Sequence, residues 1–236
     1  MSARAVADPA DVAIVGVGAL GCAAAEALAA SRSTRLILID GDVVERSNLH
    51  RQLLHREADL GRPKVESAAD RLRARHAGAA IAPRQARVTA ENAATLLAGM
   101  QCIVDATDGF ESKFLLNDAA VALGTPFVHA GIVRFLGQVM TILPGRTACL
   151  RCLFGAPPEP GDVPSCQEAG VLGSLAGTIG LLQAAEALRV IAGVGPALAD
   201  RLLTYDALER RFRQVRLRRN ALCATCAALA GTDCSS

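Results

Sequence analysis

The sequence predicts a Rossmann-like α/β fold: a mainly parallel sheet with helices on both faces, followed by antiparallel C-terminal strands. Two observations predict it. Through the first half of the chain, short apolar stretches alternate with helical ones, which is the pattern of a parallel sheet covered by its crossover helices. The first apolar stretch, DVAIVG, then runs into Gly16, Gly18 and Gly21 at G-x-G-x-x-G spacing, which is typical of a strand–turn–helix that binds a nucleotide.

The chain has 236 residues, of which 51% are hydrophobic, and this is enough for one large core. We therefore expect a single domain over residues 1–236, with a loose tail at 227–236. From the local patterns, strands are expected at 11–16, 35–40, 79–88, 101–107 and 126–131. Helices are expected at 19–30, from just after Pro63, at 91–100 and at 111–124.

The alternation changes after residue 131. Residues 135–145 alternate as a half-exposed strand does, and residues 147–170 are irregular and rich in Pro and Gly. We expect a mobile loop after the first C-x-x-C pair, which ends at Cys152. A long apolar helix is expected at 171–195. Residues 201–219 then indicate two strands joined by a short turn, which gives the antiparallel end of the sheet.

Composition argues against membrane and nucleic-acid partners. The segment at 171–195 carries Gln183, Glu186 and Arg189 at helical spacing, which would be costly in lipid, so we expect a buried helix. No secretory signal opens the chain, and we expect a cytoplasmic protein. The net charge is +2 with basic and acidic residues interspersed, and with no Trp and one Tyr there is little to stack bases on.

Asp40 ends the second strand, at about the distance from the glycines at which a carboxylate can bind a ribose. Gly16 allows the tight turn, Gly18 allows backbone to approach a phosphate, and Gly21 allows the helix to pack on the strand. These residues indicate a nucleotide without identifying it. A Gly-rich turn that holds no ligand is the alternative.

Cations follow the second strand, where ligands of open parallel sheets bind. Asn48, Arg51, Arg62 and Lys64 lie in this segment, and Lys64 is one of two lysines in a chain with 23 arginines. A forked guanidinium and a mobile ammonium suit a triphosphate better than a nicotinamide. A solvated basic loop is the alternative.

Asp105 and Asp108 follow the fourth strand at the same edge of the sheet. A carboxylate beside a triphosphate is favourable when it holds Mg²⁺, which prefers oxygen ligands. A helix N-cap is the alternative for Asp105 and Thr107. The three clusters together favour ATP with Mg²⁺ over NAD, because no hydride-transfer constellation appears. The histidines nearby are interpreted as structural: His50, His55 and His129.

Four of the eight cysteines form two C-x-x-C pairs, Cys149 with Cys152 and Cys223 with Cys226. Two such pairs without an export signal favour a closed four-thiolate Zn²⁺ site with a structural role, and a redox motif is the alternative. Cys166 lies in the irregular stretch. A free thiol there could attack an activated acyl group, and an incidental loop cysteine is the alternative.

Taken together, these motifs resemble those of the ThiF/MoeB/HesA family, the bacterial relatives of ubiquitin-activating enzymes. The resemblance runs from about residue 11 to 227 and rests on IVGVGALGC, DGDVVERSNLHRQ, GRPKVESA, DATDGF, the two C-x-x-C pairs and CQEAGVLGSLAGTIGLLQAAEALRVIAG. It implies adenylation of the C-terminal glycine of a small ubiquitin-like sulfur carrier that ends in Gly-Gly, of the ThiS or MoaD type. Pyrophosphate would be released, and the pathway would be thiamin or molybdopterin biosynthesis.

The resemblance also implies a role for each site residue. Three glycines would line the nucleotide and a carboxylate would hold its ribose: Gly16, Gly18, Gly21 and Asp40. Four residues would contact the phosphates: Ser47, Asn48, Arg51 and Lys64. Asp108 would hold Mg²⁺, and zinc would be bound by Cys149, Cys152, Cys223 and Cys226. Cys166 matches a loop cysteine that some members link covalently to the carrier and others do not need.

Three positions depart from the family pattern. Ten residues precede Asp11, where the family usually has about twenty, including an arginine that can reach a neighbouring subunit's ATP. Gly109 stands where an Asn commonly follows the metal-binding Asp, and His50 replaces a frequent Gln. The chain has no rhodanese-like extension, so we expect a separate sulfur donor protein.

A non-catalytic relative that holds nucleotide or carrier without turnover is the second reading, and an NAD-dependent oxidoreductase is the third. We also expect a homodimer. The Gly-rich helix and the C-terminal strands carry more apolar surface than one chain can cover.

Overall fold

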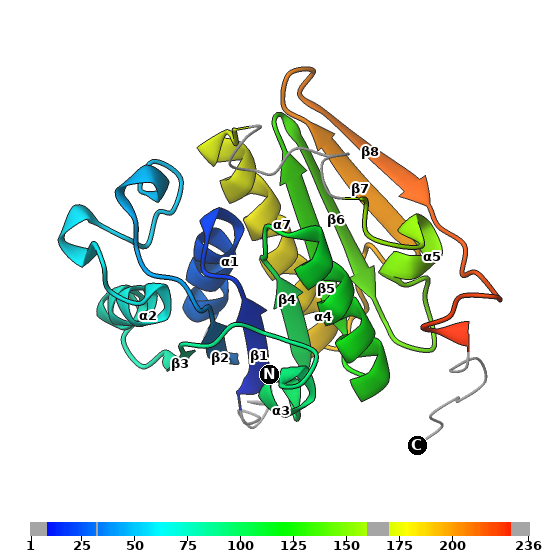
Figure 1. The fold of residues 1–236 in the computed structure, drawn as a ribbon, viewed down its shortest axis with the longest axis horizontal. Helices are drawn as coiled ribbons and strands as arrows, with labels where there is room; N and C mark the ends of the chain where they lie inside the picture. The colour runs from blue at the N-terminus through cyan, green and yellow to red at the C-terminus, as the bar shows by residue number, and fades with distance from the viewer. Residues whose placement is uncertain (1–8, 32, 160–169, 228–236) are drawn as a thin grey trace, which may run out of the picture.

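The computed structural model describes residues 9–31, 33–159 and 170–227. Its centre is one eight-stranded sheet in the order β3-β2-β1-β4-β5-β6-β7-β8 (Figure 1). The first five strands are mutually parallel, and β6, β7 and β8 extend the sheet antiparallel. The predicted fold class is confirmed.

The strands of the sheet are short and regular. The parallel ones are β1 (Ala10–Val15), β2 (Thr34–Ile39), β3 (Ala80–Arg84), β4 (Cys102–Asp105) and β5 (Phe127–Val133). The antiparallel ones are β6 (Leu136–Ile142), β7 (Arg201–Asp206) and β8 (Arg211–Arg216).

Helices cover both faces of the sheet (Figure 1). One face carries α1 (Ala19–Ala30), α2 (Lys64–Arg75) and α7 (Gly173–Ile191). The other carries α3 (Ala93–Leu97), α4 (Phe110–Leu123) and α5 (Leu150–Phe154). Along β1, Val12 and Ile14 enter the first core while Ala13 and Val15 enter the second. Since both faces are buried, the strand reads as a continuous apolar run rather than an alternating one.

Several expected elements differ from the structure in extent. The strand predicted at 79–88 ends at Arg84, and the helix predicted at 91–100 is the single short helix α3. The irregular stretch from 147 contains α5. Residues 160–169 of the predicted mobile loop lie outside the described residues.

The half-exposed strand predicted at 135–145 is the clearest correction. All residues from Val139 to Ile142 of β6 are buried. Val139 lies in the core beside α7, while Met140 and Ile142 lie in the core on the opposite face. This part of the strand, which the alternation predicts to have one solvent-exposed face, is therefore buried on both faces, because α7 packs behind it.

The helix α7 is long and apolar enough to cross a membrane by length and composition alone. Its polar side chains show that it is a core helix instead. Gln183 donates from Nε2 to the carbonyl oxygen of Asp105 at 2.7 Å, and Glu186 accepts from Thr141 Oγ1 at 2.7 Å and from the Leu198 amide at 2.9 Å. Buried polar groups are favourable when paired, and the Gln183 Nε2 and the Glu186 carboxylate are paired with the sheet or its connections.

We predict that Gly180→Ala destabilises the protein because α7 packs closely on α1 there. A Cβ atom at Gly180 would lie 2.4 Å from the Leu20 carbonyl oxygen and 2.9 Å from Ala23 Cβ. The expected loss is about 1–3 kcal/mol of unfolding free energy, measured by urea denaturation.

Gly177→Ala is the matched control on the same helix, since a Cβ there meets no heavy atom within 4 Å. It should be neutral or stabilise by up to about 1 kcal/mol through helix propensity. Equal effects of the two substitutions would contradict close packing between α1 and α7.

Candidate functional site

A cavity of about 1340 Å³ lies along the carboxyl ends of the parallel strands. Gly16, Gly18, Asp40, Arg51 and Lys64 line it, together with Asp108. A smaller polar pocket of about 450 Å³ is lined by Asn48, Arg51, Lys64 and Asp108 as well. The structure thus brings the glycine, cation and carboxylate clusters to one edge of the sheet, where open α/β folds bind their ligands.

The glycines differ in what they do. Gly16 has a φ of +93°, and a Cβ there would lie 2.6 Å from the Ala106 carbonyl oxygen, so the turn packs on the loop after β4. Gly21 faces the backbone of the turn, where a Cβ would lie 2.0 Å from the Gly16 carbonyl oxygen. A Cβ at Gly18 would have Gln52 Nε2 as its nearest contact, at 3.7 Å. Gly16 and Gly21 serve packing, whereas Gly18 leaves its backbone open to a ligand.

The Asp40 carboxylate is oriented by backbone amides. Its Oδ2 accepts from the Val17 amide at 2.7 Å, and its Oδ1 accepts from the Asp42 amide at 2.8 Å. Each carboxylate oxygen has a second lone pair, so both can still accept from hydroxyl groups of a ligand. The carboxylate is therefore held in place, beside the glycine turn, before anything binds.

The cations lie in a polar network. Arg51 donates from Nη2 to Asn48 Oδ1 at 2.7 Å and from Nη1 to the Ser47 carbonyl at 3.2 Å. Lys64 is 7% exposed and its Nζ lies 3.1 Å from Asp42 Oδ2. An anion that binds here competes with Asp42 for the Lys64 ammonium, while Arg51 is already directed by its neighbours.

Two of the predicted residues lie apart from the cavity wall. The exposed Ser47 side chain lines neither cavity, and its hydroxyl donates to Glu45 Oε2 at 3.4 Å. Arg62 pairs with Asp59 at 2.8 Å and Asp70 at 2.6 Å on the surface. Cys166 lies outside the described residues.

Asp108 and Asp105 have opposite environments. Asp108 is exposed, lines both cavities, and has no hydrogen bond or ion pair with any residue in the described part of the chain. Asp105 is fully buried and accepts from Thr107 Oγ1 at 2.6 Å. The helix-cap interpretation of Asp105 and Thr107 is wrong, because α4 begins after Gly109 with no side-chain cap.

Lys113 lies beneath the loop that carries Asp108. Its Nζ donates to the carbonyl oxygens of Thr107 and Ala130, each at 2.7 Å, and lies 3.3 Å from Asp105 Oδ2. The ammonium thereby ties the loop after β4 to β5. All three donors of the ammonium are used, so its position is determined by the fold.

His129 completes this buried network. Its Nδ1 lies 2.8 Å from Asp105 Oδ2. Burial alone would raise the pKa of the Asp105 carboxyl, but Lys113 and the hydrogen bond from His129 outweigh it and lower the pKa to about 2. Burial lowers the pKa of His129 against the pull of Asp105. At neutral pH the network is therefore a carboxylate, an ammonium and a neutral imidazole.

Two buried polar atoms on the cavity wall have no protein partner among the described residues: Gln52 Oε1 and His129 Nε2. Buried polar atoms are nearly always paired, so each of these is available to a ligand or an ordered water. Sequence patterns did not single out Gln52, Asp42 or Lys113. The scarcity of lysine that drew attention to Lys64 applies equally to Lys113 and could have found it.

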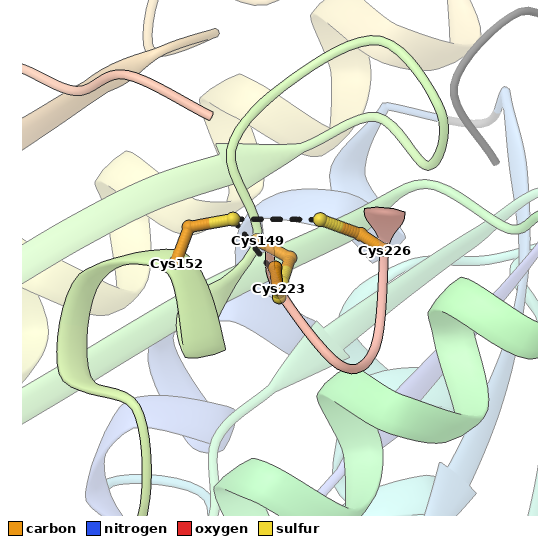
Figure 2. A group of neighbouring side chains, drawn as sticks. All are labelled: Cys149, Cys152, Cys223 and Cys226. Atoms are coloured by element: carbon orange, nitrogen blue, oxygen red, sulfur yellow. Dashed lines mark hydrogen bonds between the residues drawn. The ribbon is translucent and has the colours of Figure 1, made fainter. Parts of the chain in front are cut away.

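The four paired cysteines form a second site, between α5 and the C-terminal segment (Figure 2). Their sulfur atoms all lie within 4.8 Å of one another. Sγ–Sγ distances are 3.8 Å from Cys149 to Cys152, 3.6 Å from Cys149 to Cys223, and 3.4 Å from Cys152 to Cys226. Four sulfurs around a tetrahedral ion with bonds of about 2.3 Å lie about 3.8 Å apart, so the donor set fits such an ion.

A family model described as the ThiF family matches residues 6–225. The chain belongs to the ThiF family. It is 45% identical over 215 residues to the SAMP-activating enzyme E1 of Haloferax volcanii, covering 91% of this chain and 79% of that protein. It is 46% identical over 222 residues to the sulfur carrier protein adenylyltransferase of Thermus thermophilus, covering 92% and 82%.

Two further similar proteins are matched over only part of their own length. The chain is 44% identical over 216 residues to the adenylyltransferase and sulfurtransferase MOCS3 of Bos taurus, covering 91% of this chain and 48% of that protein. Among solved structures, E. coli MccB with ATP superposes with a TM-score of 0.82 at 22% identity, covering 92% of this chain and 67% of that one. That likeness concerns the fold.

We predict that Lys113 positions the Asp108 loop for binding of Mg²⁺–ATP. Lys113→Met removes the hydrogen bonds to the Thr107 and Ala130 carbonyls. It also leaves the buried Asp105 carboxylate without the positive charge that pairs with it. It should cost about 3–5 kcal/mol of unfolding free energy and weaken Mg²⁺–ATP binding, measured by urea denaturation and calorimetry.

The double variant Lys113→Met with Asp105→Asn separates the two effects. It restores charge balance, and the amide oxygen still accepts from Thr107, so most of the lost stability should return. Because the hydrogen bonds to the Thr107 and Ala130 carbonyls are still missing, the weakened Mg²⁺–ATP binding should remain. A double variant that binds Mg²⁺–ATP as the wild type does would contradict the positioning role.

Proposed function

We propose that this chain is an ATP-dependent adenylyltransferase that activates the C-terminal glycine of a small ubiquitin-like sulfur carrier. The observation that carries the proposal is the meeting of an open Gly18 backbone, the Arg51 and Lys64 cations and the exposed Asp108 carboxylate in one cavity. Membership of the ThiF family supports it, as do relatives named for activating SAMP or adenylylating sulfur carrier proteins.

In this proposal each cluster acts on one part of ATP. Asp40 accepts from the ribose hydroxyls, and the Gly18 backbone admits the phosphates. Arg51, Lys64 and Asn48 face the smaller pocket and would contact the phosphate chain. Asp108 would hold Mg²⁺, which would neutralise phosphate charge when bound.

The reaction is an in-line displacement at the α-phosphorus. A carboxylate oxygen of the carrier's terminal glycine forms the new bond to the α-phosphorus, and the bond from that phosphorus to the bridging oxygen of pyrophosphate breaks. Negative charge grows on the departing pyrophosphate, where Arg51 and Lys64 stabilise it. The reaction needs no general base, because the attacking carboxylate is already ionised at neutral pH.

The same cations argue against the oxidoreductase reading. A nicotinamide dinucleotide has two phosphates bound at the glycine turn and needs no second cationic pocket beyond them. Here a polar pocket of about 450 Å³ overlaps the large cavity, and Arg51, Lys64 and Asp108 line both. Such a pocket has the cations and the carboxylate that a triphosphate and its metal ion need.

We also propose that the four-cysteine site binds Zn²⁺. The sulfur distances fit a tetrahedral ion, and four protein ligands leave no open position, which is the arrangement of structural zinc. The site would fasten the segment around Cys223 and Cys226 to α5. The pathway (thiamin or molybdopterin), the separate sulfur donor, the cytoplasmic location and the homodimer stay predictions. For the dimer, Leu172, Leu181 and Val194 offer exposed apolar surface.

Carrier-dependent exchange of pyrophosphate into ATP tests the proposed function. A purified Gly-Gly carrier from the same genome should support exchange, and Asp108→Ala should reduce it at least about 100-fold through loss of the metal ligand. Glu111→Gln is the matched control, because Glu111 is exposed nearby in α4 and lines neither cavity.

Exchange without any carrier, or exchange that survives Asp108→Ala, would overturn the assignment. A wild type that binds ATP and carrier without exchange would instead indicate the non-catalytic relative.

Zinc content tests the four-cysteine site. The purified protein should carry one Zn²⁺ per chain, and Cys223→Ser should lower both zinc content and Tm because ligand loss removes folding energy. Cys102→Ala is the control: Cys102 is buried in β4, away from the cluster, and zinc content should be unchanged. A zinc-free protein with wild-type Tm would rule the site out.

A further inference from the structure

Positive charge is concentrated in the last two strands, their turn and the residues directly after them. Residues 201–219 contain seven arginines against Asp206 and Glu209, a net charge of +5, whereas the whole chain carries +2. The even mixture of charges expected from the composition is therefore wrong for this hairpin. The remainder of the chain is acidic on balance, so the charge is asymmetric, and such asymmetry indicates a partner of opposite sign.

The arginines of β8 lie at the free edge of the sheet (Figure 1). Every residue of β8 is exposed. Successive side chains of a strand point to opposite faces, and Arg211 and Arg213 share the face that lines the large cavity. Neither side chain forms an ion pair or hydrogen bond with any residue of the described ranges. Their charges are available to a partner.

Apolar side chains flank these two arginines on the same face. Leu136 of β6 is opposite Asp206, which is opposite Arg211, and Val215 follows Arg213 by two residues. Leu136 is 56% exposed and Val215 is 49% exposed. We name this surface, formed by Leu136, Arg211, Arg213 and Val215, the arginine strip.

The arginine strip is continuous with the site. The cavity that begins at the glycine turn reaches Leu136, Arg211 and Arg213 at its far end. A reactant that approaches the nucleotide along the cavity from β8 passes over the strip. The strip is thus placed to contact the body of a protein whose terminal residues enter the cavity.

Resting on the proposed function, we propose that the arginine strip is the docking surface for an acidic patch of the carrier protein. Arg211 and Arg213 pair with carboxylates beside the carrier's C-terminal tail, and Leu136 and Val215 contact apolar side chains between them. Pairing of this kind selects among carriers by charge and accelerates their encounter.

Two other occupants fit less well. A second copy of this chain related by a twofold axis would place the arginines of one strip against those of the other, which is repulsive. A nucleic acid needs aromatic platforms for its bases. The aromatic pair of the hairpin, Tyr205 and Phe212, is stacked on itself at 4.3 Å, and Phe212 lies on the opposite face of β8 from Arg211 and Arg213.

Arg213→Glu and Arg216→Glu form a matched pair of variants. Both residues are exposed on β8 and both changes alter the net charge equally, but Arg216 lies on the opposite face, in register with Arg201. The substrate is a purified Gly-Gly carrier from the same genome. Arg213→Glu should raise the KM for this carrier roughly tenfold and leave the KM for ATP unchanged, whereas Arg216→Glu should change neither.

Rising salt should raise the carrier KM of the wild type more than that of Arg213→Glu, because the paired charges are screened. Equal effects of the two variants on the carrier KM, or none, would overturn the proposal while leaving the proposed function intact. So would an Arg213→Glu variant that loses affinity for a bulk tRNA probe but not for the carrier. If the wild type shows no exchange, carrier affinity measured by calorimetry still tests the strip, with loss in Arg213→Glu alone as the supporting result.

Discussion

The site depends on one close contact between backbones. The turn after β1 lies so near the loop after β4 that Gly16 has no room for a side chain against the Ala106 carbonyl. These two strands are neighbours, and the chain leaves β1 toward β2 on one side while β4 and β5 lie on the other, so the contact is at the switch point of the sheet. It sets the separation of Gly18, which is open to a ligand, from Asp108, whose exposed carboxylate lines the cavity.

The polar groups of the site fall into two sets. Asp105, Lys113 and His129 are buried, and Asp105 accepts from both of the others while Lys113 also donates to the carbonyls of Thr107 and Ala130. This set holds the loop after β4. Arg51, Lys64 and Asp108 border the cavities and keep part of their capacity for a ligand. This separation gives the site a rigid support and leaves the charges at its border able to interact with a ligand, which is how preorganised sites lower the cost of binding charged reactants.

Features with local or fixed spacing could be predicted from the sequence. The parallel strands follow from apolar runs, the turn from three glycines, and the four-sulfur cluster from two C-x-x-C pairs brought together over 74 residues. The pairings of Lys113 and Asp42 could not, because no motif links Lys113 to the Ala130 carbonyl or Asp42 to Lys64, and only the fold brings them together. The sequence did not predict the burial of β6 for the same reason: α7 covers a face that the alternation alone predicts to be exposed to solvent.

In the proposed reaction, the carrier's terminal carboxylate becomes bonded to AMP in this cavity. Intact-mass spectrometry of a Gly-Gly carrier, incubated with the protein, ATP and Mg²⁺ and quenched in acid, tests it most directly. We predict a carrier whose mass has increased by one adenylyl group, with pyrophosphate as the co-product and no such species for a carrier that lacks its terminal glycine. An unmodified carrier accompanied by ADP and phosphate would contradict the account.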